Sequence, residues 1–266
     1  MISIFLLKLL LSFLVGGSYV AFTIWVSEKF GSKLGGLLIG LPTTLLVSLL
    51  FIAWTQNSQA AVSSIPVVPA TIGLASIFLA TFIYQFKHGK VFAYSSAVIV
   101  WLLITFSFVL FSLKNIFLSI ILGIIFIALA LYLLNNFPHR KLTSYKSSIN
   151  EFLFRCLFAG SIITLAVFLG KLLGPLWGGV FASFPVAFSS SLLLLERKHG
   201  IEFTSSVAKT MPYGNLANIL FATAFYFLVP AIGIVIGTII AYSLSLVFAV
   251  FVNKYILNRK KDYLIK

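Results

Sequence analysis

The stretch FGSKLGGLLIGLP, Phe30–Pro42, has a counterpart in LGPLWGGVFASFP, Leu173–Pro185, at an offset of 143 positions. Each stretch carries two adjacent glycines and, six positions after the second of them, a proline. Glycine and proline determine backbone geometry more than surface chemistry, so their recurrence at one spacing indicates a repeated backbone. The two stretches therefore predict two copies of one structural unit.

The offset continues without a gap from Phe30–Tyr84 to Leu173–Phe227, where 11 of 55 aligned pairs are identical. A composition this biased gives roughly one match in ten by chance. Gly17 and Ser18 also match Gly160 and Ser161, which brings the first apolar segment into the repeat. An internal duplication is predicted.

The composition predicts an integral membrane protein, because 61% of the 266 residues are hydrophobic and only 9% are charged. Five acidic and 19 basic residues are too few to cover a soluble core of this size. The single cysteine, Cys156, excludes an internal disulfide and a multi-thiolate metal site.

An apolar helix of about 20 residues crosses the hydrocarbon core of a bilayer. By this length criterion the sequence predicts an all-α protein with nine transmembrane helices. The predicted spans are Ile2–Val26, Leu34–Trp54, Pro66–Phe86, Val91–Ser112, Ile116–Leu134, Phe152–Gly170, Leu176–Leu195, Met211–Val229 and Ala231–Val252.

Lysine and arginine concentrate on the cytoplasmic side of membrane proteins. With nine spans, three basic residues fall on one side and 15 on the other, and we expect Arg155, just inside the sixth span, to extend its guanidinium to the interface. This bias predicts an outside N-terminus, a cytoplasmic C-terminus and a multi-pass protein of a bacterial cytoplasmic membrane. The net charge of +14 then requires no nucleic-acid partner.

Five spans precede the second copy, so that copy enters the membrane from the opposite side and the repeat is inverted. Spans one to three correspond to spans six to eight, while the ninth corresponds to either the fourth or the fifth. The uncharged TQNSQAAVSS and its charged counterpart ERKHGIEFTSS are expected as loops on opposite sides. The predicted organisation is a first repeat at 1–134, a cytoplasmic linker at 135–150, a second repeat at 151–252 and a basic tail at 253–266.

Small residues recur every fourth position, and so on one helix face, at Gly36, Gly40, Thr44 and Ser48 and again at Gly179, Ser183, Ala187 and Ser191. One interpretation is a close-packed helix seam. The other is a pair of helices broken at Pro42 and Pro185, with carbonyl groups freed toward a cavity. The expected packing or hinge residues are Gly35, Gly36, Gly40, Gly178, Gly179, Ser183, Pro69 and Pro212.

Hydroxyl groups follow each predicted break, and two amides, Asn215 and Asn218, share one face of the eighth span. Each hydroxyl can instead bond to its own helix, and each amide to a neighbouring helix. Because inverted-repeat transporters bind substrate where interrupted helices meet, these residues form the candidate substrate site. The candidates are Pro42, Thr43, Thr44, Ser48, Pro185, Ser189, Ser190, Ser191, Tyr213, Asn215 and Asn218.

The five acidic residues lie in predicted loops, at span ends or in the tail, and the three histidines lie in basic loops. Carboxylates at mid-depth are the usual proton carriers in membranes, so a proton relay is not expected. No metal, cofactor or enzymatic activity is predicted. An ion coupled to transport would be held by carbonyls, hydroxyls and amides, as sodium is.

The segment GGVFASFPVAFSSSLLLLERKHGIEFTSS, Gly178–Ser206, resembles the GlpM-like family of small bacterial inner-membrane proteins. The resemblance rests on the Phe184–Pro185 pair and on the ERKHGIE segment, and it covers about fifty residues. It implies a half-length ancestor whose copies paired antiparallel, and an association with exopolysaccharide production.

Two functions follow as hypotheses. The first is a secondary transporter or facilitator of a small solute, with its site between broken helices two and seven and helix eight. The second is a non-transporting scaffold or accessory protein for envelope polysaccharide biosynthesis, with a filled apolar centre. The candidate partners are the lipid bilayer, a small-molecule substrate and a second copy of the chain.

Overall fold

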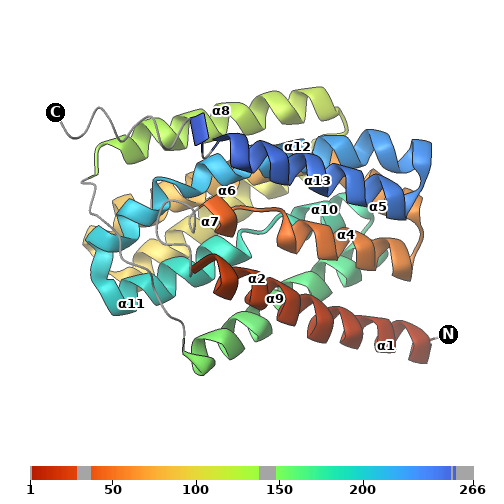
Figure 1. Cartoon of the computed structure of the whole chain (residues 1–266), viewed down its shortest axis with the longest axis horizontal. Coiled ribbons are helices and arrows are strands. Elements are labelled where there is room, and N and C mark those ends of the chain that lie inside the picture. The colour runs from red at the N-terminus through yellow and green to blue at the C-terminus, as the bar shows by residue number, and fades with distance from the viewer. Residues whose placement is uncertain (1, 29–36, 138–147, 253, 256–266) are drawn as a thin grey trace.

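A computed structural model describes residues 2–28, 37–137, 148–252 and 254–255, and this part of the chain contains helices and no strands. The helices form one bundle whose members run along its long axis or cross it obliquely (Figure 1). The α-helices are α1 Ile2–Leu11, α2 Gly17–Glu28, α4 Thr43–Thr55, α5 Ser58–Ser63, α6 Val68–Gln85, α7 Lys90–Leu110, α8 Ile116–Asn135, α9 Ile149–Leu172, α10 Pro175–Ala182, α11 Val186–Ala208, α12 Met211–Ile232 and α13 Ile234–Val252.

The described residues contain nine helical segments long and apolar enough to cross a membrane, which confirms the predicted number and the multi-pass class. A π-helical turn, Ser12–Gly16, joins α1 and α2 into the first of them. The nine segments are Ile4–Ser27, Leu37–Thr55, Ser58–His88, Lys90–Leu110, Ile116–Asn135, Ile149–Leu172, Pro175–Ala208, Met211–Ile232 and Ile234–Val252.

Two segments are longer than predicted, because polar sequence expected as loops is helical. Residues 58–63 form α5, whose N-terminus is capped by the Asn57 side chain accepting the Ala60 N–H at 2.8 Å. Residues 201–208 continue α11 beyond a kink at Gly200, where φ is +75°. The positive φ favours glycine, so Gly200 permits the change of direction.

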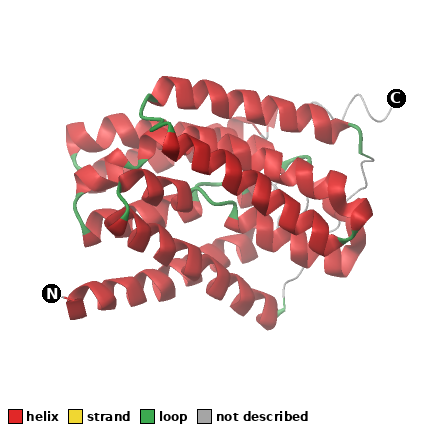
Figure 2. Ribbon diagram, turned by 180° about the vertical axis from the view of Figure 1, so that it is seen from behind, coloured by secondary structure: helices red, strands yellow, loops and turns green. Residues whose placement is uncertain are grey.

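The third and seventh segments form the centre of the bundle. Within their most apolar windows 83% of residues are buried, against 22% and 28% in the fourth and fifth segments. Figure 2 shows loops at both ends of the bundle and also in its middle, where the second and seventh segments are interrupted. The second segment is 67% buried by the same measure, so the two helices predicted to be broken lie toward the interior, and the fourth and fifth segments present apolar side chains outward.

Charged side chains of α9 and α11 lie together near the start of α9. Lys198 and Glu151 form an ion pair with a 2.8 Å N–O distance, which joins the start of α9 to α11. Arg155, one turn beyond Glu151, is 1% exposed, so the expectation that it reaches the membrane interface is wrong. Neighbouring protein covers its side chain.

Candidate functional site

The second segment is interrupted between residues 39 and 43, in the middle of the bundle (Figure 1). Pro42 has no N–H to donate to Leu38, and the Leu38 carbonyl accepts instead from Leu41 N–H at 3.1 Å. The Thr43 N–H then bonds Leu41 O at 2.7 Å in a tight turn. Helix α4 begins immediately after this turn.

The break at Pro185 repeats this geometry bond for bond at the offset of 143. Pro42 and Pro185 have the same φ of −74°, with ψ angles of 41° and 59°. Four backbone hydrogen bonds recur, as donor to acceptor: Gly40 to Leu37 and Ser183 to Val180, Leu41 to Leu38 and Phe184 to Phe181, Thr43 to Leu41 and Val186 to Phe184, and Leu46 to Pro42 and Ser189 to Pro185.

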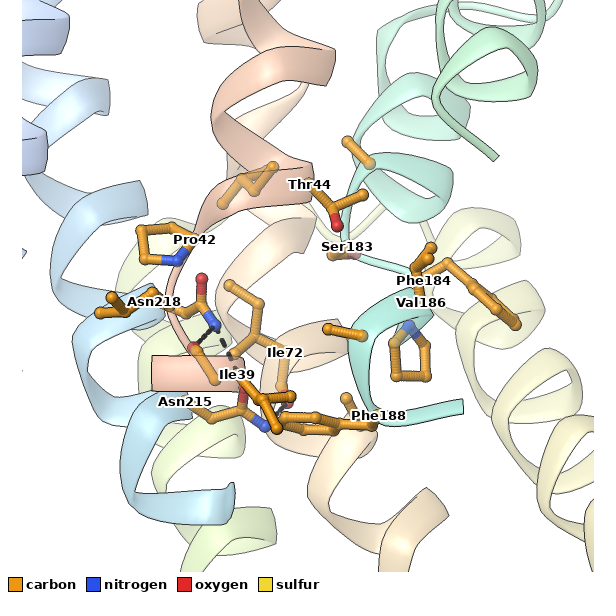
Figure 3. Close-up of a pocket in the computed structure, with 17 residues that line it drawn as sticks. Ile39, Pro42, Thr44, Ile72, Ser183, Phe184, Val186, Phe188, Asn215 and Asn218 are labelled. Carbon is orange, nitrogen blue, oxygen red and sulfur yellow. Dashed lines mark hydrogen bonds between the residues drawn. The ribbon is translucent and has the colours of Figure 1, made fainter. Parts of the chain in front are cut away.

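A cavity of about 40 Å³ lies between the two breaks and α12 (Figure 3). That volume holds about three water molecules. Of its 17 lining residues, 16 form eight pairs at the offset of 143, and the seventeenth, Val186, is the counterpart of Thr43. The pairs are Ile39 and Ala182, Gly40 and Ser183, Leu41 and Phe184, Pro42 and Pro185, Thr44 and Ala187, Leu45 and Phe188, Ile72 and Asn215, and Ala75 and Asn218.

The two amides of α12 tie the cavity walls together. Asn215 Nδ2 donates to the Ile72 carbonyl at 3.0 Å and to Ser76 Oγ at 2.9 Å, both on α6. Asn218 Nδ2 donates to the Gly40 carbonyl at the first break and to Asn215 Oδ1 at 3.2 Å. The interhelical bonding considered as an alternative is therefore present, and both amides still line the cavity.

Hydroxyl groups occupy the same region. Ser183 Oγ and Thr71 Oγ1 are 2.6 Å apart, which links the second break to α6. The Thr44 hydroxyl turns toward the space between the two breaks (Figure 3), and within the described residues it has no hydrogen-bond partner. None of the 17 lining residues is charged.

The structure brings together part of the predicted site. Pro42, Thr44, Pro185, Asn215 and Asn218 line the cavity, and so do Gly40 and Ser183, which were predicted to be packing or hinge residues. The remaining candidates lie outside the lining: Thr43, Ser48, Ser189, Ser190, Ser191 and Tyr213.

Three of those serine hydroxyls differ in their hydrogen bonding. Ser190 Oγ donates to the Val186 carbonyl one turn back at 2.9 Å. Ser48 and its counterpart Ser191 are almost completely buried, and neither hydroxyl has a hydrogen-bond partner in the described part of the chain.

The glycine seam also exists. A Cβ atom at Gly40 would lie 2.7 Å from Gly214 Cα, and one at Gly178 would lie 3.2 Å from Gly170 Cα. Gly179 approaches the backbone of Ser64 even more closely. Small residues therefore permit backbone contact at these helix crossings. Gly35 and Gly36 lie outside the described residues.

Pro69 and Pro212 lie in the first turns of α6 and α12, where a missing N–H costs no helical hydrogen bond. Both prolines therefore lie at helix starts and not in helix interiors.

The sequence analysis missed the apolar lining, such as Ile39, Leu45, Phe184 and Phe188. Apolar side chains give no chemical signal in a chain so rich in them. The 143-residue offset could have identified these positions. Each missed residue is adjacent to a predicted residue, or it lies at or beside the position that corresponds to a predicted residue in the other half.

The fold and cavity define a polytopic helical membrane protein with a small internal cavity, whose mostly apolar wall includes a few polar groups. Residues 9–116 match the family model described as a protein of unknown function (DUF3147). No curated protein and no solved structure matches the chain. The family match falls on the first half, whereas the GlpM-like resemblance was drawn on the second, and no named homologue supports that resemblance.

Proposed function

We propose that the protein is a secondary-type transporter or facilitator of a small solute, which binds in the cavity between two inverted repeats. One observation carries the proposal: the cavity wall is built from paired positions of the two halves. A site shared equally by two repeats changes its exposure when one repeat moves against the other. The scaffold alternative, with a filled apolar centre, has no comparable support.

Reciprocal contacts support the repeat. Gly40 packs against Gly214, and their counterparts Ser183 and Thr71 are hydrogen-bonded to each other. Asn215 bonds its own counterpart, Ile72. Contacts of this kind are expected of two units related by a twofold axis.

The ends of the third and eighth segments support pairing the ninth span with the fourth. Gly89, with φ of +101°, separates the third segment from α7, and Gly233, with φ of +84°, separates α12 from α13. The two glycines are 144 positions apart, one more than the repeat offset. In this arrangement α8 has no counterpart and connects the halves.

The direction of the chain supports inversion. Figure 1 shows α1 and α2 running from the end marked N toward the opposite end of the bundle, while α9 runs the other way across them. The bias of basic residues then favours an outside N-terminus in a bacterial cytoplasmic membrane. A half-length, GlpM-like ancestor that paired antiparallel agrees with this arrangement.

Purified protein in liposomes tests the proposal. We expect faster flux than in empty liposomes for at least one of three probes: potassium salts of small anions with valinomycin, labelled sodium, or urea. Asn218→Leu removes the donor to the Gly40 carbonyl and a polar wall of the cavity, so flux falls by about tenfold or more. Thr238→Val removes a buried hydroxyl of α13 that has no hydrogen-bond partner among the described residues, and it serves as the control. Equal flux in empty and protein-containing liposomes for every probe would reject transport.

A further inference from the structure

Four backbone N–H groups at the cavity have no acceptor among the residues that the structure describes. They belong to Thr44 and Leu45 at the start of α4 and to their counterparts Ala187 and Phe188 at the start of α11. All four residues line the cavity, and within the described residues no hydrogen bond from their N–H groups is formed. The residues that precede the helices are Pro42 and Pro185, which have no side-chain oxygen to cap them.

Buried N–H groups without an acceptor are rare in proteins, because each loses the hydrogen bond that it made to water. Helix N-termini also carry a partial positive charge that attracts anions. Here two such termini meet at one cavity, in the interior of the bundle where the effective dielectric constant is low. The unmet requirement is for a hydrogen-bond acceptor, and a negative charge satisfies it best.

Thr44 supplies an independent observation. Its side chain is 8% exposed, its hydroxyl turns into the space between the breaks in Figure 3, and it has no partner in the described part of the protein. A hydroxyl without a partner at this depth adds a fifth donor to the same cavity.

Acceptor groups at the cavity are fewer. In the described residues, the carbonyls of Ile39, Ala182 and Ser183 receive no hydrogen bond, and neither does the amide oxygen of Asn218. The Gly40 carbonyl is occupied by Asn218. Carbonyls tolerate a missing bond better than N–H groups do, and no carboxylate lines the wall to balance a cation. The balance of groups therefore favours an anion over a sodium-like cation.

We propose that the cavity binds one small monovalent anion, of the size of a halide, nitrate or formate ion, held by the starts of α4 and α11 and by the Thr44 hydroxyl. The cavity volume of about 40 Å³ suits an ion of a few atoms. As the transported substrate, this anion rests on the proposed function, but its binding can be measured without transport.

The test is thermal unfolding of the purified full chain in detergent, with sodium gluconate replaced by sodium chloride, nitrate or formate at constant sodium concentration. We expect the midpoint to rise with the concentration of at least one small anion and to saturate, because a ligand bound only by the folded state stabilises it. Thr44→Val should weaken the apparent affinity about tenfold, whereas Thr44→Ser should keep it. Thr43→Val, at a buried neighbour outside the lining, should leave it unchanged.

Two results would overturn the anion site: the same midpoint in all four salts, or equal weakening by Thr43→Val and Thr44→Val. In liposomes, flux of sodium or urea without flux of any small anion would reject the anion as the transported substrate while leaving transport intact. Saturable anion binding with no flux of any probe would keep the site and reject the transport function.

Discussion

At the scale of single residues, the two halves of the cavity differ in which of their paired positions carry polar side chains. Thr44 has a hydroxyl where its counterpart Ala187 has a methyl group, and Asn218 has an amide where Ala75 has a methyl group. The backbone donors at the two helix starts are paired, but these side-chain groups occur once. The cavity wall therefore uses paired positions of the two halves, but its polar side chains are distributed unequally between them.

This asymmetry gives a prediction for Ala187→Ser. The new hydroxyl would lie at the position equivalent to Thr44 and would give the anion another donor. We expect anion affinity to rise about threefold to tenfold, measured by the same salt-dependent unfolding. Ala53→Ser, on α4 away from the cavity lining, is the control and should have no effect. Unchanged affinity in Ala187→Ser would place the anion away from the start of α11.

Individual polar residues were predictable where polarity is rare. Asn215, Asn218 and Thr44 are conspicuous in apolar helices, and the structure places all three at the cavity. Ser189 and Ser190 are equally conspicuous but lie outside the lining, because only certain faces of α11 meet the space. Sequence shows which residues share a helix face, and the packing of neighbouring helices determines which face borders a cavity.

At the scale of elements, each break follows from one proline, and each break exposes one helix start. The absent N–H and the ring of proline prevent a regular helix through the site. The resulting turn leaves the next residues without acceptors. At each break two backbone N–H groups lose their helical acceptors. These four N–H groups are the backbone donors of the proposed site.

Pro185→Ala tests this link between break and site. Alanine restores an N–H and favours a continuous helix from α10 into α11, by up to about 3 kcal/mol relative to proline. We expect a midpoint without anion that is equal to or above that of the wild type, and a loss of the anion-dependent rise. Pro175→Ala, in the first turn of α10 where proline is tolerated, should keep both values. If Pro185→Ala kept the full anion-dependent rise in the unfolding midpoint, anion binding would not depend on the helix break.

The polar segments before the third span and after the seventh were harder to predict. The sequence TQNSQAAVSS contains capping and turn residues, so it favours a loop. In the structure Asn57 caps α5, and Ala61 and Val62 are buried against the bundle. Tertiary packing thus determines a helix that local composition does not favour.

At the scale of the whole molecule, the nine spans of the described residues require that the chain ends lie on opposite sides of the membrane. We expect a protease added to intact spheroplasts to remove an N-terminal epitope tag and to spare a C-terminal one. The opposite pattern would reverse the orientation and keep the inversion. Removal of both tags, or of neither, would contradict an odd number of spans and with it the proposed division into five and four.

The number of spans was predictable, because length and hydropathy suffice for that. The position of each span in the bundle was not. Lipid-facing and protein-facing surfaces are similarly apolar, so the central third segment and the outer fourth segment look alike in sequence. Only the glycines and prolines of the repeat pointed to the second and seventh spans as interior elements.

The hydrogen bond from Asn215 to Ile72 has a bearing on the history of the molecule. In a dimer of identical chains, a residue on the twofold axis contacts the same residue of the other chain, so the two side chains must be identical. Once both copies are encoded in one chain, the two equivalent residues at the axis can differ. Under the proposed duplication, Asn215 and Ile72 are such a pair, and the side-chain amide of one now donates to the backbone carbonyl of the other.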